Sequence, residues 1–193
     1  MRRVIVSEFV SLDGVVQGPG GGEPEYKHEG WTFDIDQDPA MYEYKLEELK
    51  ESGALLLGRV TYEGFAAAWP ERDDEAGFAN KFNNMPKYVA STTLKDPAWN
   101  NSHVLDGDVA EAVAALKELD GGPLLVNGSP TLLKALYDAD LVDEYRLMVF
   151  PVILGSGKRL FPDDAAGKRK LTLTSTRIYS NGIVLSVLEP VRD

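Results

Sequence analysis

The sequence contains no cysteine and only two histidines, His28 and His103, among its 193 residues. The absence of cysteine excludes disulfides, thiolate catalysis and cysteine-ligated zinc sites, and two histidines are too few for a histidine-rich metal centre. We therefore expect no bound metal. A chain without cysteine is also compatible with the reducing cytoplasm, which is the location that we expect.

Long hydrophobic runs are missing as well, and acidic residues outnumber basic ones. No stretch approaches the roughly 20 apolar residues that a membrane-spanning helix requires. Residues Met1–Val6 have the pattern of a first strand and are too short for a secretory signal. The formal net charge of −11 disfavours nonspecific binding to nucleic acid or to an anionic membrane. The expected partner is therefore a small molecule, with no nucleic acid and no membrane.

The composition is that of an ordinary globular protein. Hydrophobic residues make up 44% of the chain and charged residues 26%, which is typical of folded domains. A chain of this length can bury a substantial core. Because no internal repeat, low-complexity tract or linker interrupts it, we expect residues 1–193 to form a single domain.

The hydrophobic pattern predicts alternating strands and helices, followed by a region of strands. Strands are predicted at 4–9, 54–57, 87–90, 103–105, 124–126 and 145–150, and helices at 38–52, 61–69, 108–119 and 131–137. Residues 71–84 are polar and are predicted to hold a short helix. Strands at 171–179 and 183–188 are predicted to form a hairpin through Ser180-Asn181-Gly182. This order predicts an α/β fold with a largely parallel sheet and antiparallel strands at the C-terminal end.

The glycine-rich segment 18–22 cannot form regular structure, and it follows the first strand closely. It is either an ordinary surface connection or a lid over a site.

One strand-to-helix junction has the composition of a phosphate-binding corner. A buried strand ends at Leu57, Gly58 permits a tight turn, and Arg59 and Thr61 open the next helix. The start of a helix presents free N–H groups and a partial positive charge, to which a guanidinium and a hydroxyl add further donors.

A second junction of this kind follows the strand 124–126, with Gly128 and Ser129 before the helix. The carboxyl ends of parallel strands lie at one edge of a sheet, so two helix starts there can hold a dinucleotide pyrophosphate. Neither junction is a Rossmann G-x-G-x-x-G or a P-loop. Either junction alone is more often an ordinary capped turn. The pair, together with the hydroxyls of 91–93 after a third strand, favours nucleotide binding.

Six segments occur in an order that resembles the dihydrofolate reductase-like superfamily. They are Ser11-Leu12-Asp13-Gly14, Leu57-Gly58-Arg59-Val60-Thr61-Tyr62, Val89-Ala90-Ser91-Thr92-Thr93, Val126-Asn127-Gly128-Ser129, Leu141-Val142-Asp143-Glu144 and the run 151–161. Within the superfamily, the chain is most similar to the reductase domain of the bifunctional riboflavin-biosynthesis deaminase–reductase, over about Val4 to Leu188. The resemblance implies a three-layer α/β/α fold and hydride transfer from NADPH.

The resemblance also implies which residues contact the cofactor. The set follows the ends of three strands and comprises Gly58, Arg59, Thr61, Ser91, Thr92, Gly128 and Ser129. Arg59 with Ser91 and Thr92 would hold the 2′-phosphate, which favours NADPH over NADH. Gly128 and Ser129 would face the pyrophosphate and the nicotinamide ribose.

For the substrate side, the resemblance implies roles for Asp13, Gly155 and Gly157. Asp13 would be the catalytic residue near the nicotinamide, where it binds a substrate N–H or supports proton delivery, and the two glycines would shape the substrate pocket. Folate-reducing members carry a carboxylate at the position of Met41, so dihydrofolate is a poor candidate substrate. The zinc deaminase half needs cysteines, so this chain is expected to be a stand-alone reductase.

The function predicted from the sequence is that of an NADPH-dependent reductase similar to 5-amino-6-(5-phosphoribosylamino)uracil reductase of riboflavin biosynthesis. Two alternatives remain open. One is a reductase of another small heterocycle or a xenobiotic, and the other is a non-catalytic nucleotide- or ligand-binding protein of the same fold. A homodimer is expected through the apolar strands 171–188, because exposed strand edges invite pairing.

Overall fold

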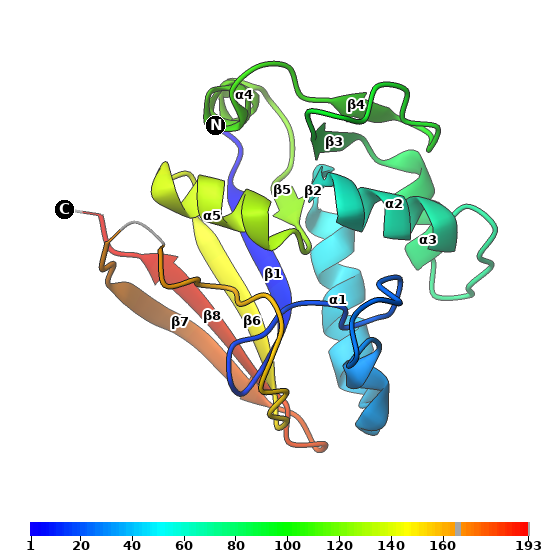
Figure 1. Ribbon diagram of the computed structural model, residues 1–193, viewed down its shortest axis with the longest axis vertical. Coiled ribbons are helices and arrows are strands. Elements are labelled where there is room, and N and C mark those ends of the chain that lie inside the picture. Colours follow the sequence, from blue (N-terminus) through cyan, green and yellow to red (C-terminus); the bar gives the residue numbers. More distant parts are fainter. Residues whose placement is uncertain (165–166, 193) are drawn as a thin grey trace.

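An eight-stranded sheet forms the centre of the molecule in the computed structural model, which describes residues 1–164 and 167–192 (Figure 1). The strands are β1 (Val4–Ser11), β2 (Ala54–Gly58), β3 (Lys87–Ala90), β4 (Ser102–Val104), β5 (Leu124–Val126), β6 (Glu144–Phe150), β7 (Leu171–Ile178) and β8 (Val184–Pro190). Their order across the sheet is β4-β3-β2-β5-β1-β6-β8-β7. The first six strands pair in parallel, whereas β8 pairs antiparallel with β6 and β7. The predicted sheet is confirmed.

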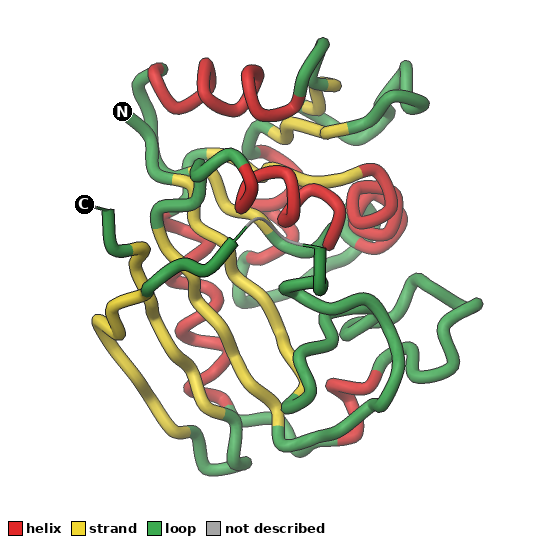
Figure 2. Tube along the Cα trace, turned by 60° about the vertical axis from the view of Figure 1, so that its left-hand side comes forward, coloured by secondary structure: helices red, strands yellow, loops and turns green. Residues whose placement is uncertain are grey.

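Helices cover both faces of this sheet, which gives the predicted three layers (Figure 2). The helices are α1 (Pro39–Glu51), α2 (Arg59–Ala68), α3 (Phe78–Asn84), α4 (Val109–Glu118) and α5 (Pro130–Asp138), with a short 3-10 helix η1 at Trp31–Asp34. The side chains of successive β1 residues point to opposite faces of the sheet. Ile5 packs with Leu49 of α1 and Tyr62 of α2, while Val6 packs with Val113 of α4 and Leu133 of α5. Within the described residues, no helix is long and apolar enough to cross a membrane.

The helix starts follow from their local sequences. Asp38 caps α1 by accepting a 2.9 Å hydrogen bond from the Ala40 amide, and Pro39 occupies the first turn, as predicted. Asp108 caps α4 in the same way through the Glu111 amide. The helix α2 begins at Arg59, two residues before the predicted start, because Gly58 is both the last residue of the strand and the helix N-cap.

The strand β1 is longer than predicted, since it continues through Ser11. Its last two residues, Val10 and Ser11, pair with Val149 and Phe150 of β6, which holds the chain extended beyond Phe9. This pairing brings the ends of β1 and β6 side by side.

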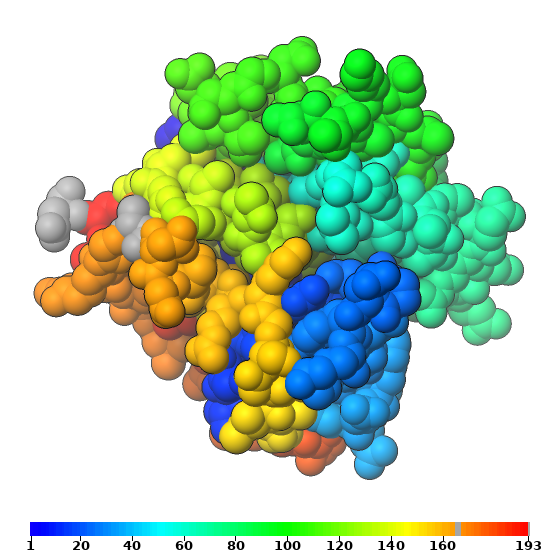
Figure 3. Space-filling view, in the orientation of Figure 1, coloured from blue at the N-terminus to red at the C-terminus, as the bar shows by residue number. Residues whose placement is uncertain are grey.

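The segments that follow β1 and β6 also pack against each other (Figure 3). Val15 forms a β-bridge with Arg159, and the Val16 amide donates to the Lys158 carbonyl at 2.9 Å. Beyond them, the indole of Trp31 packs edge-on against Phe150 with ring centroids 5.2 Å apart. These contacts fix the start of the long loop between β1 and α1 to the core.

The glycine-rich segment 18–22 is part of this loop, is hydrogen-bonded to later residues of the same loop and extends to α2. The Gly30 amide donates to the Gly18 carbonyl at 2.8 Å, and the Glu29 carboxylate accepts from the Gly22 amide at 2.6 Å. A side chain built on Gly22 would lie 3.9 Å from the Cα of Gly64, in the middle of α2. The segment therefore lies beside the helix that opens with Arg59.

Candidate functional site

The junctions β2–α2 and β5–α5 meet at the carboxyl edge of the sheet. The register pairs Leu56 of β2 with Val126 of β5, so the two turns that follow are neighbours. The hydroxyl of Thr61, in the first turn of α2, lies 3.0 Å from the hydroxyl of Ser129, the N-cap of α5. One hydrogen bond between side chains thus joins the starts of two helices.

Glycine is required at both turns because the opposite junction fills the space. A β-carbon on Gly58 would lie 2.2 Å from the Ser129 hydroxyl oxygen. Gly128 has a φ of +72°, and a β-carbon there would lie 2.7 Å from the Thr61 hydroxyl oxygen. The sequence predicted a tight turn at Gly58, and the structure shows that the missing side chain also leaves room for Ser129.

Neither helix start is capped by its own N-cap side chain. Gly58 has none, and Ser129 makes no side-chain capping hydrogen bond. Ser129 also has a φ of +61°, a left-handed conformation that is costly for a residue with a β-carbon and that is common at functional sites. Free first-turn amides and two helix dipoles that converge on one point form a site suited to an anion.

Arg59 is the first residue of α2, beside this site, and it forms an ion pair with Glu63. Its Nη1 donates to both carboxylate oxygens of Glu63, at 3.0 and 2.8 Å. The two side chains are 44% and 49% exposed, so the pair is weak and solvent-screened. A phosphate at Arg59 would have to displace or share this carboxylate.

The third predicted segment, 91–93, lies next to the first because Ala90 is the register partner of Gly58. The Ser91 hydroxyl accepts from the Leu94 amide at 2.9 Å and from the Thr93 amide at 3.2 Å, which closes a turn. The side chain of Thr92 is exposed at this turn. The seven predicted cofactor residues therefore lie at or just after the carboxyl ends of three adjacent strands, β3, β2 and β5.

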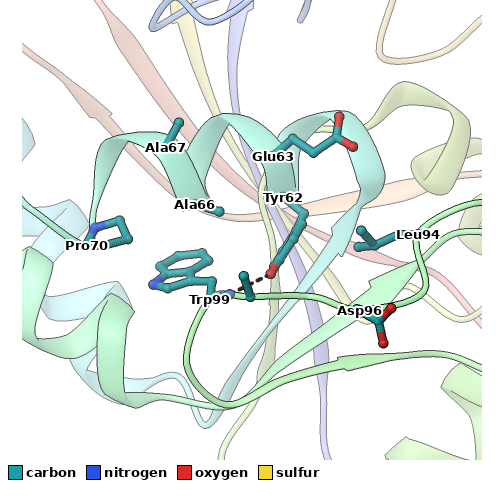
Figure 4. A pocket seen from close by; sticks show the side chains of 9 residues that line it. Tyr62, Glu63, Ala66, Ala67, Pro70, Leu94, Asp96 and Trp99 are labelled. Carbon is teal, nitrogen blue, oxygen red and sulfur yellow. Dashed lines mark hydrogen bonds between the residues drawn. The ribbon is translucent and has the colours of Figure 1, made fainter.

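A groove of about 480 Å³ opens between α2 and the segment after β3 (Figure 4). Tyr62 and Trp99 lie between its two walls, where the Tyr62 hydroxyl accepts from the Trp99 amide at 3.0 Å. The groove is lined by Tyr62, Glu63, Ala66, Ala67, Pro70, Leu94, Asp96, Ala98 and Trp99. Because Glu63 belongs to both the groove and the ion pair, the groove is contiguous with Arg59.

Glu8, which the sequence analysis did not single out, lies under the β5–α5 turn. Its carboxylate accepts a 2.6 Å hydrogen bond from the Gly128 amide, and the side-chain amide of Asn127 donates to the Ser7 carbonyl at 2.8 Å. Burial raises the pKa of Glu8 to about 8, although the hydrogen bond from Gly128 opposes this rise. The signal was present in the sequence, as a carboxylate within the apolar run Val4–Val10.

This contact limits how Gly128 takes part in binding. Its amide points inward to Glu8, so the donors left for a ligand at this turn are those of Ser129 and of the first turn of α5.

Asp13 joins the loop after β1 to the loop after β6. Its carboxylate accepts from the Ser11 hydroxyl at 2.6 Å and from the amides of Leu154 and Gly155 at 3.1 and 2.8 Å. These hydrogen bonds, with that of Ser11 foremost, lower the pKa of Asp13 to about 2. Asp13 is therefore ionised at neutral pH, where it acts as an acceptor and not as a source of protons.

Gly155 and Gly157 lie in the same loop. A β-carbon on Gly157 would lie 2.6 Å from a methyl carbon of Val15 and 2.7 Å from the hydroxyl of Tyr26, so this loop packs closely on the segment after β1. The Tyr26 hydroxyl donates to the Ser156 carbonyl at 2.7 Å. The two glycines thus form part of a wall beside Asp13, and their contact with a substrate stays a prediction.

Met41 is buried in the core among Trp31, Phe150 and Ile183. The neighbouring carboxylate, Asp38, is occupied by its capping bond and by the amide and hydroxyl of Ser180, at 2.9 and 2.7 Å. Across residues 1–164 and 167–192, no cluster of three or more acidic, histidine or cysteine side chains could hold a metal ion.

Comparison with known proteins agrees with this arrangement. A family model described as the RibD C-terminal domain matches residues 2–185. The chain is 28% identical over 186 residues to the uncharacterized protein YyaP of Bacillus subtilis (strain 168), with 95% of this chain and 92% of that protein covered.

Two solved structures share the fold. A putative riboflavin biosynthesis protein from Shewanella sp. PV-4 has a TM-score of 0.73 at 18% identity, with 98% of this chain and 99% of that chain covered. Dihydrofolate reductase from Enterococcus faecalis, complexed with NADP(H), has a TM-score of 0.62 at 15% identity, with 98% and 97% covered. The predicted dihydrofolate reductase-like fold is confirmed, and because the family model spans nearly the whole sequence, the chain belongs to the RibD C-terminal domain family.

Proposed function

We propose that this protein is an NADPH-dependent reductase of a small heterocyclic substrate, similar to 5-amino-6-(5-phosphoribosylamino)uracil reductase of riboflavin biosynthesis. The observation that carries the proposal is the meeting of two helix starts at Thr61 and Ser129, with hydroxyls 3.0 Å apart. Membership of the RibD C-terminal domain family and the NADP(H) complex of a structural neighbour support it.

In this proposal, the chain binds the cofactor by its phosphates. The first-turn amides of α2 and α5 and the hydroxyls of Thr61 and Ser129 receive the pyrophosphate. Arg59, with Ser91 and Thr92 on the adjacent strand end, receives the 2′-phosphate, because a guanidinium gives a dianion charge-assisted hydrogen bonds. When bound, the reduced nicotinamide supplies the hydride.

The wall formed by Asp13 and the loop 154–157 then faces the substrate. Asp13 is ionised and already fixed by two backbone amides, so it orients an N–H donor of the substrate without itself moving. Fixing the reacting groups in this way is the part of the rate enhancement that the protein provides through orientation.

The test is to titrate NADPH into the folded protein by calorimetry and to follow the oxidation of NADPH with a panel of substrates. The panel holds the ribosylamino-uracil phosphate, other small heterocycles and dihydrofolate. Turnover of a heterocycle supports the proposal, and dihydrofolate is expected to be inactive because Met41 replaces the carboxylate. Binding without oxidation of any substrate favours a nucleotide-binding protein, and absence of NADPH binding refutes the proposal.

The cytoplasmic location and the homodimer are also proposed. The strand β7 is at the edge of the sheet, and its side chains Leu173 and Ile178 are 54% and 75% exposed. Such an edge strand favours pairing with a second copy. A mass of one chain in light scattering would refute the dimer.

A further inference from the structure

The buried carboxyl of Glu8 contacts the turn that opens α5, and no step of the proposed reaction uses it. Glu8 is 5% exposed and its carboxylate lies 2.6 Å from the amide nitrogen of Gly128. The preceding residues are also tied, since Asn127 donates to the Ser7 carbonyl at 2.8 Å. Two successive residues of β1 therefore hold two successive residues of the β5–α5 turn.

These hydrogen bonds hold the part of the backbone that forms the anion site. Gly128 has left-handed backbone angles and Ser129 follows with a φ of +61°, a strained conformation that its surroundings must enforce. On the other side of the turn, the Ser129 hydroxyl meets Thr61. The turn is thus held at two points, by Glu8 through the Gly128 backbone amide and by Thr61 through the Ser129 hydroxyl.

The charge state of Glu8 is set by few groups. Burial disfavours the ionised form, and the Gly128 amide and the Lys45 ammonium favour it. Glu48, on the same helix as Lys45, disfavours it again. With a pKa of about 8, Glu8 is mainly protonated at neutral pH and ionised in mild alkali.

We propose that Glu8 is a positioning residue of the nucleotide site, which holds the Gly128–Ser129 turn for phosphate binding and whose negative charge, once it ionises, weakens that binding. The inference rests on the proposed function. An ionised carboxylate next to the start of α5 lowers the positive potential that the helix amides offer to a phosphate, and it does so in a buried environment where charges are poorly screened. By linkage, phosphate binding raises the proton affinity of Glu8, so nucleotide binding near pH 8 takes up a proton.

The test measures NADPH affinity as a function of pH in the wild type and in Glu8→Gln. The glutamine carbonyl can still accept from the Gly128 amide, but it carries no charge at any pH. The matched control is Glu118→Gln, an exposed carboxylate on α4. The range runs from about pH 7 to about pH 10, because the 2′-phosphate is mainly a dianion there.

We expect the dissociation constant of the wild type and of the control to rise about tenfold through pH 8, and that of Glu8→Gln to stay flat. Lys87 has a pKa of about 8 as well, but it is common to all three proteins and cancels in the comparison. As a second measurement, calorimetry of the wild type in buffers of different ionisation enthalpy is expected to show proton uptake on NADPH binding.

The outcomes separate the inference from the proposed function. NADPH binding with the same pH dependence in Glu8→Gln and the wild type, or without proton uptake by the wild type, overturns the role of Glu8 alone. A folded wild type and a folded variant that both fail to bind NADPH at every pH overturn the proposed function and this inference with it.

Discussion

The hydroxyl of Thr61 contacts the hydroxyl of Ser129 at 3.0 Å, across 68 positions of sequence. Each residue belongs to the start of a helix, and each helix follows a strand of the same parallel sheet. The contact explains why both turns need glycine, because each turn occupies the space that a side chain of the other would need. The candidate anion site is therefore assembled by the packing of two junctions, and disturbing either one should disturb both.

Replacing Gly58 by alanine tests this packing. The new β-carbon would lie 2.2 Å from the Ser129 hydroxyl oxygen and 2.5 Å from its β-carbon, so the two junctions must separate. We expect a loss of about 2 kcal/mol in the free energy of unfolding, in the range of overpacked cores, and weaker NADPH binding by about tenfold or more. Chemical denaturation and calorimetric titration measure the two effects.

The control for this substitution is Gly64→Ala in the middle of the same helix. Nothing lies within 4 Å of a β-carbon at Gly64, so alanine there should stabilise α2 by about 0.5–1 kcal/mol through its higher helix propensity. If both variants keep wild-type affinity for NADPH, the junction is not the phosphate site.

Arg59 is expected to select NADPH over NADH. Arg59→Ala should weaken NADPH binding about tenfold or more and NADH binding much less, since only NADPH carries the 2′-phosphate. Glu63→Gln releases the guanidinium from its half-exposed carboxylate partner and should tighten NADPH binding two- to threefold, in keeping with about 0.5 kcal/mol for such a pair. Equal losses for both cofactors in Arg59→Ala would remove Arg59 from this role.

Much of the architecture follows from local sequence patterns. The apolar strand Ala54–Leu57 and the capped helix after Asp38 were predictable because period, cap and glycine agree locally. The register that pairs Gly58 with Ala90 could not be predicted, since pairing between distant strands depends on the packing of the whole sheet.

For the candidate site, too, some features could be predicted from the sequence and others could not. Its residues could be proposed from the order of six motifs, but their contacts could not. One such contact is the ion pair that Glu63, four residues along the same helix, forms with the Arg59 guanidinium. The inward orientation of the Gly128 amide depends on Glu8, which is 120 positions away in the sequence.

Lys87 is a further residue whose environment the sequence does not reveal. It is fully buried, and its ammonium donates to the carbonyls of Asn83, Met85 and Asn100, at 3.2, 2.9 and 2.7 Å. Lys87→Met fills the same space but leaves three carbonyls without this donor, so we expect a loss of about 3 kcal/mol or more in stability. NADPH affinity of the folded protein should not change, because these groups lie at the amino end of β3. A denaturation midpoint equal to that of the wild type would show that water replaces the ammonium.

Glu8 should also make stability depend on pH. Its pKa is about 8 in the folded protein and about 4.5 in the unfolded chain, so the folded state binds the proton more tightly. Stability from the protonated carboxyl is fully present below pH 4.5, decreases as pH rises, and is lost by the time pH has passed 8. The loss is on the order of 5 kcal/mol for a fully buried carboxyl.

Denaturation at several pH values in the wild type and in Glu8→Gln measures this component. The variant should be close to the wild type in stability near pH 5 and more stable near pH 9, and the gap should stop growing above the pKa of about 8. A gap that does not change between these limits would mean that Glu8 titrates normally in the folded protein.

Asp13 is expected to act on the substrate side only. With a pKa of about 2, it carries its charge throughout the pH range in which activity would be assayed. Asp13→Asn removes that charge and can keep only part of the acceptor contacts to Ser11, Leu154 and Gly155, so the loop after β6 loses an anchor. We expect turnover of a heterocyclic substrate to fall by about tenfold or more, with NADPH affinity within about twofold of wild type.

An equal loss of NADPH affinity would instead mean that Asp13 supports the cofactor site as well as the substrate side. Unchanged turnover would exclude Asp13 from the reaction. Because the carboxylate is ionised at all working pH values, the pH profile of the remaining activity should keep its wild-type shape, which a proton donor at this position would not allow.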